Sequence, residues 1–151
     1  MFQLCFSFPL TCLNIFHFQI LAQIFGHTHT DTFRVFLKDS EAKNVAFIAP
    51  SITPLVGWGT GTNPGIRLFH YQQNQTFLSN YHQFYANLLQ ANLAKKIKWE
   101  KLYDFQDLYN VSDLSPSNVL KVYEEMWTQE DLYDRIYQLN TLLKFNGKSH
   151  F

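Results

Sequence analysis

The segment that most constrains this chain is the hexapeptide Gly26-His27-Thr28-His29-Thr30-Asp31. An apolar run from Ile20 to Phe25 precedes it, and the segment from Thr32 to Leu37 alternates as a strand does. Residues i and i+2 of extended backbone point to the same side, so His27 and His29 are predicted to face one metal ion or two adjacent ions. Neutral imidazole is a common ligand for zinc.

A His-x-His pair alone is weak evidence for a metal site. Six histidines in 151 residues will sometimes fall two apart by chance, and the competing interpretation is a pair of partly exposed histidines at a strand end. Gly26 favours the metal site, because it leaves room for the backbone to turn where a side chain would obstruct a close ligand.

Composition limits the class of protein. Hydrophobic residues make up 46% of the chain and aromatic residues 17%, which predicts one folded domain with a real core. Twelve basic and 12 acidic side chains cancel, so we do not expect nucleic acid or an acidic membrane surface as a partner. Cysteine occurs only at Cys5 and Cys12, which excludes a disulfide framework from the rest of the chain.

The pattern predicts an α+β protein, with strands first and helices after them. We expect strands at 20–25, 32–37, 44–49 and 66–71, a hairpin turn at 38–43 and a glycine-rich loop at 51–65. That loop is not a P-loop, because no Gly-Lys-Ser/Thr follows it. Helices are expected from about Asn80, over 104–109, from Ser115-Pro116, and from Thr128 with a stop near Gly147. The first is predicted by apolar residues three and four apart, namely Tyr81, Phe84, Tyr85, Leu88 and Leu89.

Residues 1–19 form an atypical hydrophobic stretch. It has no Lys or Arg, whereas a signal peptide opens with a positive region and closes on small residues. Pro9, Asn14, His17 and Gln19 interrupt it, whereas a transmembrane helix needs about twenty apolar residues. We expect an artefact of the gene model ahead of a signal peptide, with a membrane anchor third.

Several short motifs, in order, resemble one family. They are Gln23 to Asp31, Ala46 to Ser51, Asn63 to Arg67, Asn87-Leu88 with Gln90 to Asn92, and Trp99 to Tyr103. The hexapeptide resembles the last metal-ligand motif of calcineurin-like metallophosphoesterases. The whole set, from about Ile20 to about Lys148, resembles the acid sphingomyelinase and sphingomyelinase-like phosphodiesterase family. The resemblance implies that residues 20–79 are the C-terminal strands of a metallophosphoesterase β-sandwich, and residues 80–151 a helical C-terminal region.

The resemblance also implies a zinc chemistry. Family members bind two zinc ions, and by their pattern His27 would hold one ion and His29 the other. The other ligand motifs, and the histidine credited with protonating the leaving group, would precede Gly26. We therefore expect no catalytic residue in this chain, and no activity from the chain alone. Leu55, Trp58 and Asn63 would line the substrate loop, where Leu55 replaces an aromatic residue and leaves the headgroup preference open.

The implied reaction is phosphoric diester hydrolysis, with sphingomyelin as the first expected substrate and ceramide and phosphocholine as products. A nucleotide or another small phosphodiester is the alternative substrate, and a non-catalytic secreted binding module is the alternative from another class. A sphingolipid substrate would bring the protein to a membrane lipid surface. The resemblance implies a secreted or lysosomal protein. Two sequons, at Asn74 and Asn110, agree with that location as glycosylation sites.

Overall fold

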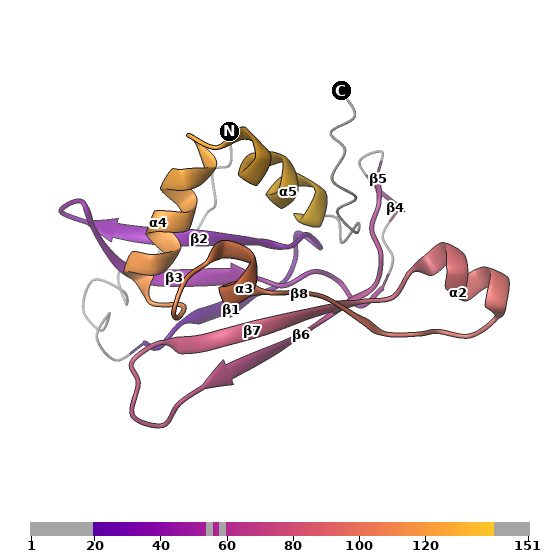
Figure 1. Cartoon of the computed structure of the whole chain (residues 1–151). Coiled ribbons are helices and arrows are strands. Elements are labelled where there is room, and N and C mark those ends of the chain that lie inside the picture. Colours follow the sequence, from indigo (N-terminus) through magenta and orange to yellow (C-terminus); the bar gives the residue numbers. More distant parts are fainter. Residues whose placement is uncertain (1–19, 54–55, 58–59, 141–151) are drawn as a thin grey trace.

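A computed structural model describes residues 20–53, 56–57 and 60–140 (Figure 1). In chain order the elements are β1 (Gln23–Phe25), β2 (Thr32–Lys38), β3 (Glu41–Ile48), β4 (Val56–Gly57), β5 (Thr60–Gly61), β6 (Gly65–Tyr71), β7 (Leu78–Tyr85), α2 (Leu88–Ala94), β8 (Glu100–Asp104), α3 (Phe105–Tyr109), α4 (Pro116–Met126) and α5 (Glu130–Asn140). The predicted α+β class is confirmed. No helix within the described residues is both long enough and apolar enough to cross a bilayer.

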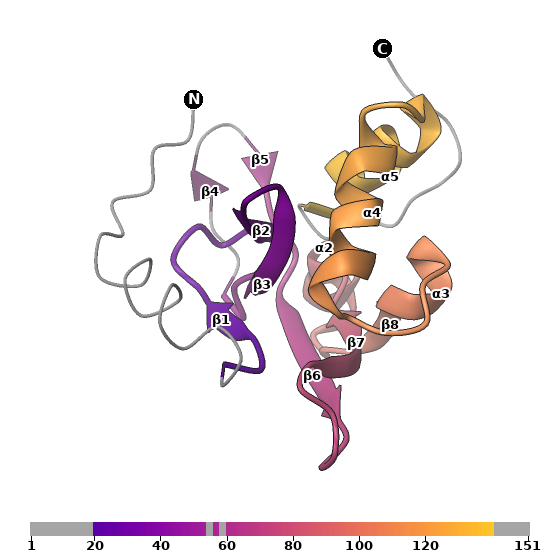
Figure 2. The ribbon, with the colours of Figure 1, turned by 90° about the vertical axis from the view of Figure 1, so that its left-hand side faces the viewer.

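The strands form two three-stranded sheets and a small ribbon. One sheet has the order β1-β3-β2, with β1 parallel and β2 antiparallel to β3. The other has the order β6-β7-β8 and is antiparallel throughout, while β4 and β5 pair as a two-stranded ribbon. Figure 2 shows α3, α4 and α5 together on one side of β2 and β3. Of these helices, α4 packs directly on β3 and β2, α5 packs on α4, and α3 packs on β7 and β8 of the second sheet.

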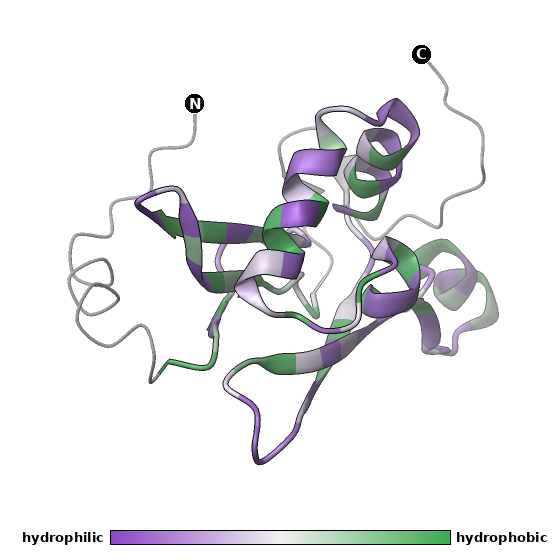
Figure 3. Ribbon diagram, turned by 60° about the vertical axis from the view of Figure 1, so that its left-hand side comes forward, coloured by the Kyte–Doolittle hydropathy of each residue, from purple (hydrophilic) through white to green (hydrophobic). Residues whose placement is uncertain are grey.

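Aromatic side chains from both sheets and from α3 meet in one core. The rings of Phe47 and Tyr81 lie 5.7 Å apart in an edge-to-face arrangement, and Phe105 lies 5.0 Å from Tyr81, distances at which aromatic pairs attract. Val119 and Val122 of α4 are fully buried against the same cluster. In Figure 3 the helices α4 and α5 carry hydrophilic and hydrophobic bands, as amphipathic helices do.

Most strand predictions are confirmed, with shifted ends. β1 is only three residues long, and β3 begins at Glu41, so the hairpin between β2 and β3 turns at Asp39 and Ser40 alone. Both residues have positive φ, 54° and 66°, as a two-residue type I′ hairpin requires. The sequence prediction had placed this turn over 38–43.

The helix predicted from about Asn80 is wrong. Leu78–Tyr85 is the strand β7, and the helix α2 begins only at Leu88. Along β7 the residues Tyr81, Gln83 and Tyr85 are buried and those between them are not, which is the period of two of a strand. β7 is hydrogen-bonded to β6 on one side and β8 on the other, and the sequence reasoning assigned no element to β8. The division at residues 79 and 80 falls inside β7 and, as a division into domains, stays a prediction.

Candidate functional site

The predicted ligand loop leaves β1 at Gly26. β1 is held by its parallel pairing with β3, where Phe25 lies opposite Ile48, and the Ala49 N–H donates to the Phe25 carbonyl at 2.8 Å. Parallel pairing next to the buried strand β3 fixes where the loop begins. The chain then turns at once, without continuing the strand.

The sequence predicts extended backbone at His27 and His29, but the backbone of the loop is not extended. His27 has φ 79° and His29 has φ 62°, and the Thr28 N–H donates to the Gly26 carbonyl at 3.1 Å. These features are those of a γ-turn in its rarer, positive-φ form, centred on His27. Each non-glycine residue held at positive φ costs about 1–3 kcal/mol.

Gly26 is not the residue that makes the turn. Its φ lies outside the left-handed region, and a Cβ added to it would meet no atom within 4 Å. The backbone does turn at this strand end, with Gly26 as the first residue of the γ-turn, but the positive φ falls on His27 and His29. That a side chain at position 26 would obstruct a close ligand stays a prediction.

The two imidazoles differ in their surroundings. His27 is exposed and His29 is half-buried. The Nδ1 atom of His29 is buried and has no hydrogen-bond partner within the described part of the chain. A buried polar atom without a partner is costly, and a metal ion is one group that would satisfy it. Within residues 20–53, 56–57 and 60–140 no set of three or more His, Cys, Asp or Glu side chains is placed to hold a metal ion. His27 and His29 as zinc ligands stay a prediction.

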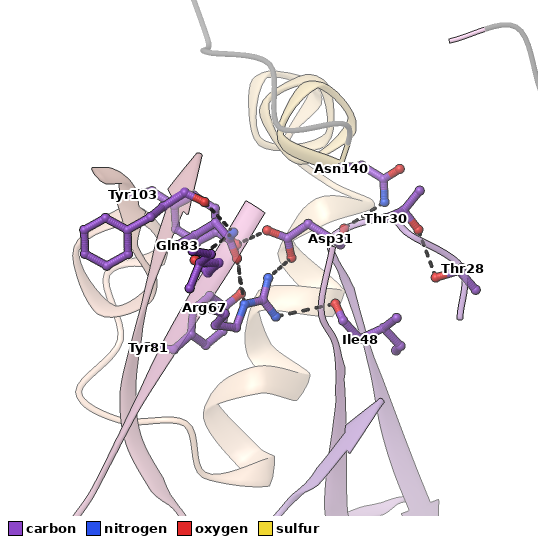
Figure 4. Close-up of polar contacts among 11 residues, drawn as sticks. Thr28, Thr30, Asp31, Ile48, Arg67, Tyr81, Gln83, Tyr103 and Asn140 are labelled. Atoms are coloured by element: carbon purple, nitrogen blue, oxygen red, sulfur yellow. Dashed lines mark hydrogen bonds and ion pairs between the residues drawn. The ribbon is translucent and has the colours of Figure 1, made fainter. Parts of the chain in front are cut away.

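The last residue of the hexapeptide, Asp31, is an anchor. Its side chain is buried, one oxygen pairs with Nη2 of Arg67, and the other accepts a hydrogen bond from the Tyr103 hydroxyl. The hydroxyl of Tyr81 lies 2.9 Å from that of Tyr103. Figure 4 shows these groups converging on the Asp31 carboxylate. The carboxylate thus joins the loop to β6 and β8, the two outer strands of the second sheet.

Arg67 is itself held on several sides. Its Nε donates to Gln83 Oε1 at 2.8 Å, and its guanidinium carbon lies 4.0 Å from the centre of the Tyr81 ring. Burial acts to lower the pKa of the Arg67 guanidinium, but the Asp31 carboxylate, together with Tyr81 and Tyr103, outweighs this, so the pKa is raised and the arginine stays charged. Burial, reinforced by Asp31, raises the pKa of Tyr103 well above its usual value, so its phenol stays a donor.

The main chain of Asp31 is tied to the end of α5. Its N–H donates to the Asn140 carbonyl at 2.9 Å, and Asn140 Nδ2 donates to the Asp31 carbonyl at 2.7 Å. Within the loop, the hydroxyl of Thr30 donates to that of Thr28 at 3.1 Å (Figure 4). Asp31, two residues after His29, is therefore fixed by groups from β6, β8 and the end of α5.

The other predicted site residues fall in different places. Asn63 Oδ1 accepts a hydrogen bond from the Leu88 N–H at 3.1 Å, so its side chain positions the start of α2. Asn74 lies exposed in the turn between β6 and β7, and Asn110 lies exposed at the C-terminal end of α3. Leu55 and Trp58, like residues 1–19 and Gly147, lie outside the described residues. Substrate contact and glycosylation stay predictions.

Sequence reasoning missed the anchor of the loop. Arg67 follows Gly65 and precedes Phe69 on the inward side of β6, and an inward-facing arginine in a strand requires a buried anionic partner. An inward-facing Arg67 therefore indicates a buried acidic residue elsewhere in the chain. It does not say which one.

Fold and site together define an α+β protein whose two paired histidines lie in a strained loop over a buried carboxylate anchor. Residues 41–147 match the acid sphingomyelin phosphodiesterase C-terminal region. The chain is 33% identical to acid sphingomyelinase-like phosphodiesterase 3b of Mus musculus, over 83% of this chain and 29% of that protein. It is 36% identical to a cyclic GMP-AMP phosphodiesterase of Bos taurus, over 74% and 25%. It is 30% identical to sphingomyelin phosphodiesterase A of Dictyostelium discoideum, over 79% and 20%.

The chain belongs to the acid sphingomyelin phosphodiesterase family and corresponds to its C-terminal region. It spans less than a third of the length of each of these three relatives.

Proposed function

We propose that this chain is the C-terminal part of a zinc-dependent phosphodiesterase and supplies two of its metal ligands, His27 and His29. The observation that carries the proposal is the strained loop, in which both histidines have positive φ beside an imidazole nitrogen that lacks a partner. Such strain persists only where the surrounding structure imposes it, and it clusters at functional sites. Here the Asp31 anchor is what imposes it.

The two metal ions would supply two kinds of catalysis. Two zinc ions, when bound, would activate a water molecule for attack on phosphorus and stabilise the charge on the phosphoryl oxygens. His27 and His29 would hold them, and Asp31 would fix the loop through Arg67 and Tyr103. Arg67 is engaged with Asp31 and Gln83, so we give it no role on the phosphate. Tyr103, with its raised pKa and its bond to Asp31, likewise acts as a positioning residue.

The substrate we place first is sphingomyelin, cleaved to ceramide and phosphocholine at a membrane lipid surface, in a secreted or lysosomal protein. A nucleotide phosphodiester is the second candidate, favoured by the 36% identity to a cyclic GMP-AMP phosphodiesterase. Both substrates would present a phosphodiester group to the metals, with different groups on either side of it. A non-catalytic secreted module is the rival from another class, and it would need no metal.

Ligand number leads us to expect a poor catalyst from the chain alone, because zinc catalytic sites take about three protein ligands each and two candidates are present here. Purified chain with added zinc would be assayed on a chromogenic phosphodiester at acid and neutral pH. Chelator-sensitive turnover at enzyme-like rates by the chain alone would contradict this expectation. In a version joined to a full catalytic domain, parallel assays on sphingomyelin and on cyclic GMP-AMP would decide between the two substrates, and a zinc-free, inactive product would favour the binding module.

A further inference from the structure

A second pair of histidines lies on the other face of the β6-β7-β8 sheet. Arg67 and Gln83 face the core, and side chains alternate along a strand, so His70 and His82 lie on the opposite, outer face of β6 and β7. Nε2 of His70 is 3.3 Å from Nδ1 of His82, and the ring centres are 4.4 Å apart at 57°. Figure 1 shows β6 and β7 as a hairpin apart from α4 and α5, while the start of α3 contacts this face through Asn80 and Asp104.

Asp104 of β8 orients His82. Its Oδ2 lies 2.6 Å from His82 Nε2, so in the neutral imidazole, the form that binds metals, this contact places the proton on Nε2 and leaves the Nδ1 lone pair towards His70. The carboxylate is fixed in turn by Asn80 Nδ2 at 2.8 Å and by the Asp107 N–H at 3.3 Å. A carboxylate bonded to the far nitrogen of an imidazole is the arrangement that orients metal-binding histidines.

We propose that His70 and His82 chelate a divalent transition-metal ion, with Asp104 positioning His82. A tetrahedral ion with metal–nitrogen bonds of about 2.0–2.1 Å places two ligand nitrogens about 3.3–3.4 Å apart, and these two lie 3.3 Å apart. Cu²⁺ binds most tightly to such a nitrogen site and Zn²⁺ more weakly. The described residues hold no group of three protein ligands, so water completes the coordination.

The position suits a solvent-accessible ion. The His82 side chain is 27% exposed, and the positive charge of Lys101, 3.4 Å from Asp104 Oδ2, is balanced by that carboxylate. A plain hydrogen bond between the two imidazoles is the competing interpretation, and it predicts no ion binding.

The test is a copper titration of the full chain carrying His27→Ala and His29→Ala, which removes the loop imidazoles. Electron paramagnetic resonance should show one equivalent of Cu²⁺ coupled to two imidazole nitrogens. His70→Gln, which keeps a hydrogen-bonding side chain, should abolish the two-nitrogen signal, whereas the matched His150→Gln should leave it unchanged. Asp104→Asn, which still caps α3, should weaken binding about 10- to 100-fold.

A second measurement requires no substitution. In the natural chain labelled with ¹⁵N-histidine, NMR should show that Zn²⁺ shifts the ¹⁵N resonances of His70 Nε2 and His82 Nδ1 together. Both shifts should be complete after one equivalent of Zn²⁺ in addition to any that the loop histidines bind. The proposal is overturned if the two-nitrogen copper signal survives His70→Gln, or if Zn²⁺ leaves both nitrogens unshifted.

Discussion

At the scale of single residues, His27 and His29 combine ligand chemistry with a backbone conformation that histidine seldom adopts. Their φ values of 79° and 62° lie in the region where glycine has no steric penalty. A chain selected only for stability would favour glycine or asparagine there. Both histidines therefore carry a cost in folding free energy, and such costs cluster at functional sites.

We expect His27→Gly to stabilise the chain by about 1 kcal/mol, because it removes strain of about 1–3 kcal/mol and adds the smaller entropic cost of glycine. His27→Ala is the matched control, since alanine meets the same backbone penalty and should give no gain. Urea unfolding of both variants beside the parent would measure the difference. Equal stabilities for the two variants would show that φ at His27 carries no strain.

Breaking the buried ion pair should cost far more. Arg67→Met leaves the Asp31 carboxylate buried without its cation, and we expect a loss of about 3–5 kcal/mol. The double variant Asp31→Asn with Arg67→Met removes both charges and should recover part of that loss. Tyr103→Phe, which removes one donor to Asp31, should cost about 1–3 kcal/mol.

Denaturant unfolding, monitored by circular dichroism, would rank the stabilities of these three variants. If the double variant is less stable than Arg67→Met alone, the loss of stability comes from losing the Asp31–Arg67 ion pair and not from leaving the Asp31 carboxylate buried without a cation.

At the scale of elements, the local signals at the starts of α3 and α4 were reliable, whereas the helix expected from Thr128 begins at Glu130 and the Thr128 hydroxyl donates to the Glu125 carbonyl. Asp104 accepts from the Asp107 N–H at the start of α3, and Pro116 opens α4, both as the sequence predicted. The helix predicted from Asn80 failed because Tyr81, Phe84, Tyr85 and Leu88 satisfy a helical spacing by coincidence. Pairing with β6 and β8 outweighs that local pattern, and those partners are not visible within the segment itself.

The start of α4 is held by Asp113, which lies two residues before the expected cap and bonds the Ser115 N–H and the Asn118 side chain. Ser115 makes no side-chain cap bond, whereas Asp113 Oδ1 accepts from the Ser115 N–H at 2.9 Å and from Asn118 Nδ2 at 2.7 Å. We expect Asp113→Ala to cost about 0.5–2 kcal/mol, in the range of a lost helix cap, and Ser115→Ala to cost less. Thermal unfolding of the two alanine variants would test this order, and the reverse order would return the capping role to Ser115.

At the scale of the whole molecule, the contacts that hold the loop span most of the chain. Asp31 is bound by Tyr103, 72 residues away, and by Asn140, 109 residues away. Motifs and periodicity depend only on residues that are close in sequence, so they could indicate the histidine pair and most strands. They could not assign Asp31 to Arg67 and Tyr103, because one sequence alone contains no record of which distant residues meet.

The buried tyrosines of the core predict how stability depends on alkaline pH. Burial raises the pKa values of Tyr81, Tyr103 and Tyr109, while the unfolded phenol titrates at about 10. Below that pH both states keep the proton and stability is unaffected. Above it only the unfolded state loses protons, so the free energy of unfolding should fall by about 1.4 kcal/mol per pH unit for each tyrosine.

Urea unfolding between pH 9 and pH 11 (a range set by the phenol pKa of about 10) would measure this slope. Tyr109→Phe should make the slope shallower, whereas Tyr71→Phe, at an exposed position, should not. An equal change in both variants would contradict the assignment of the slope to buried phenols.

The last prediction concerns this chain joined to a full catalytic domain of its family. There, His27→Ala and His29→Ala should each abolish most activity, and losing both should cost little more than losing one, because residues that act as a unit are not additive. The fold should survive, since His27 is exposed and His29 half-buried, while the Asp31 anchor remains intact. Thr28→Ala removes only an exposed bond between the Thr28 and Thr30 hydroxyls and should be milder. Zinc content and turnover would be measured together for each variant. Loss of zinc in Thr28→Ala, with two zinc ions and full activity kept in His29→Ala, would show that the ligands are assigned to the wrong residues.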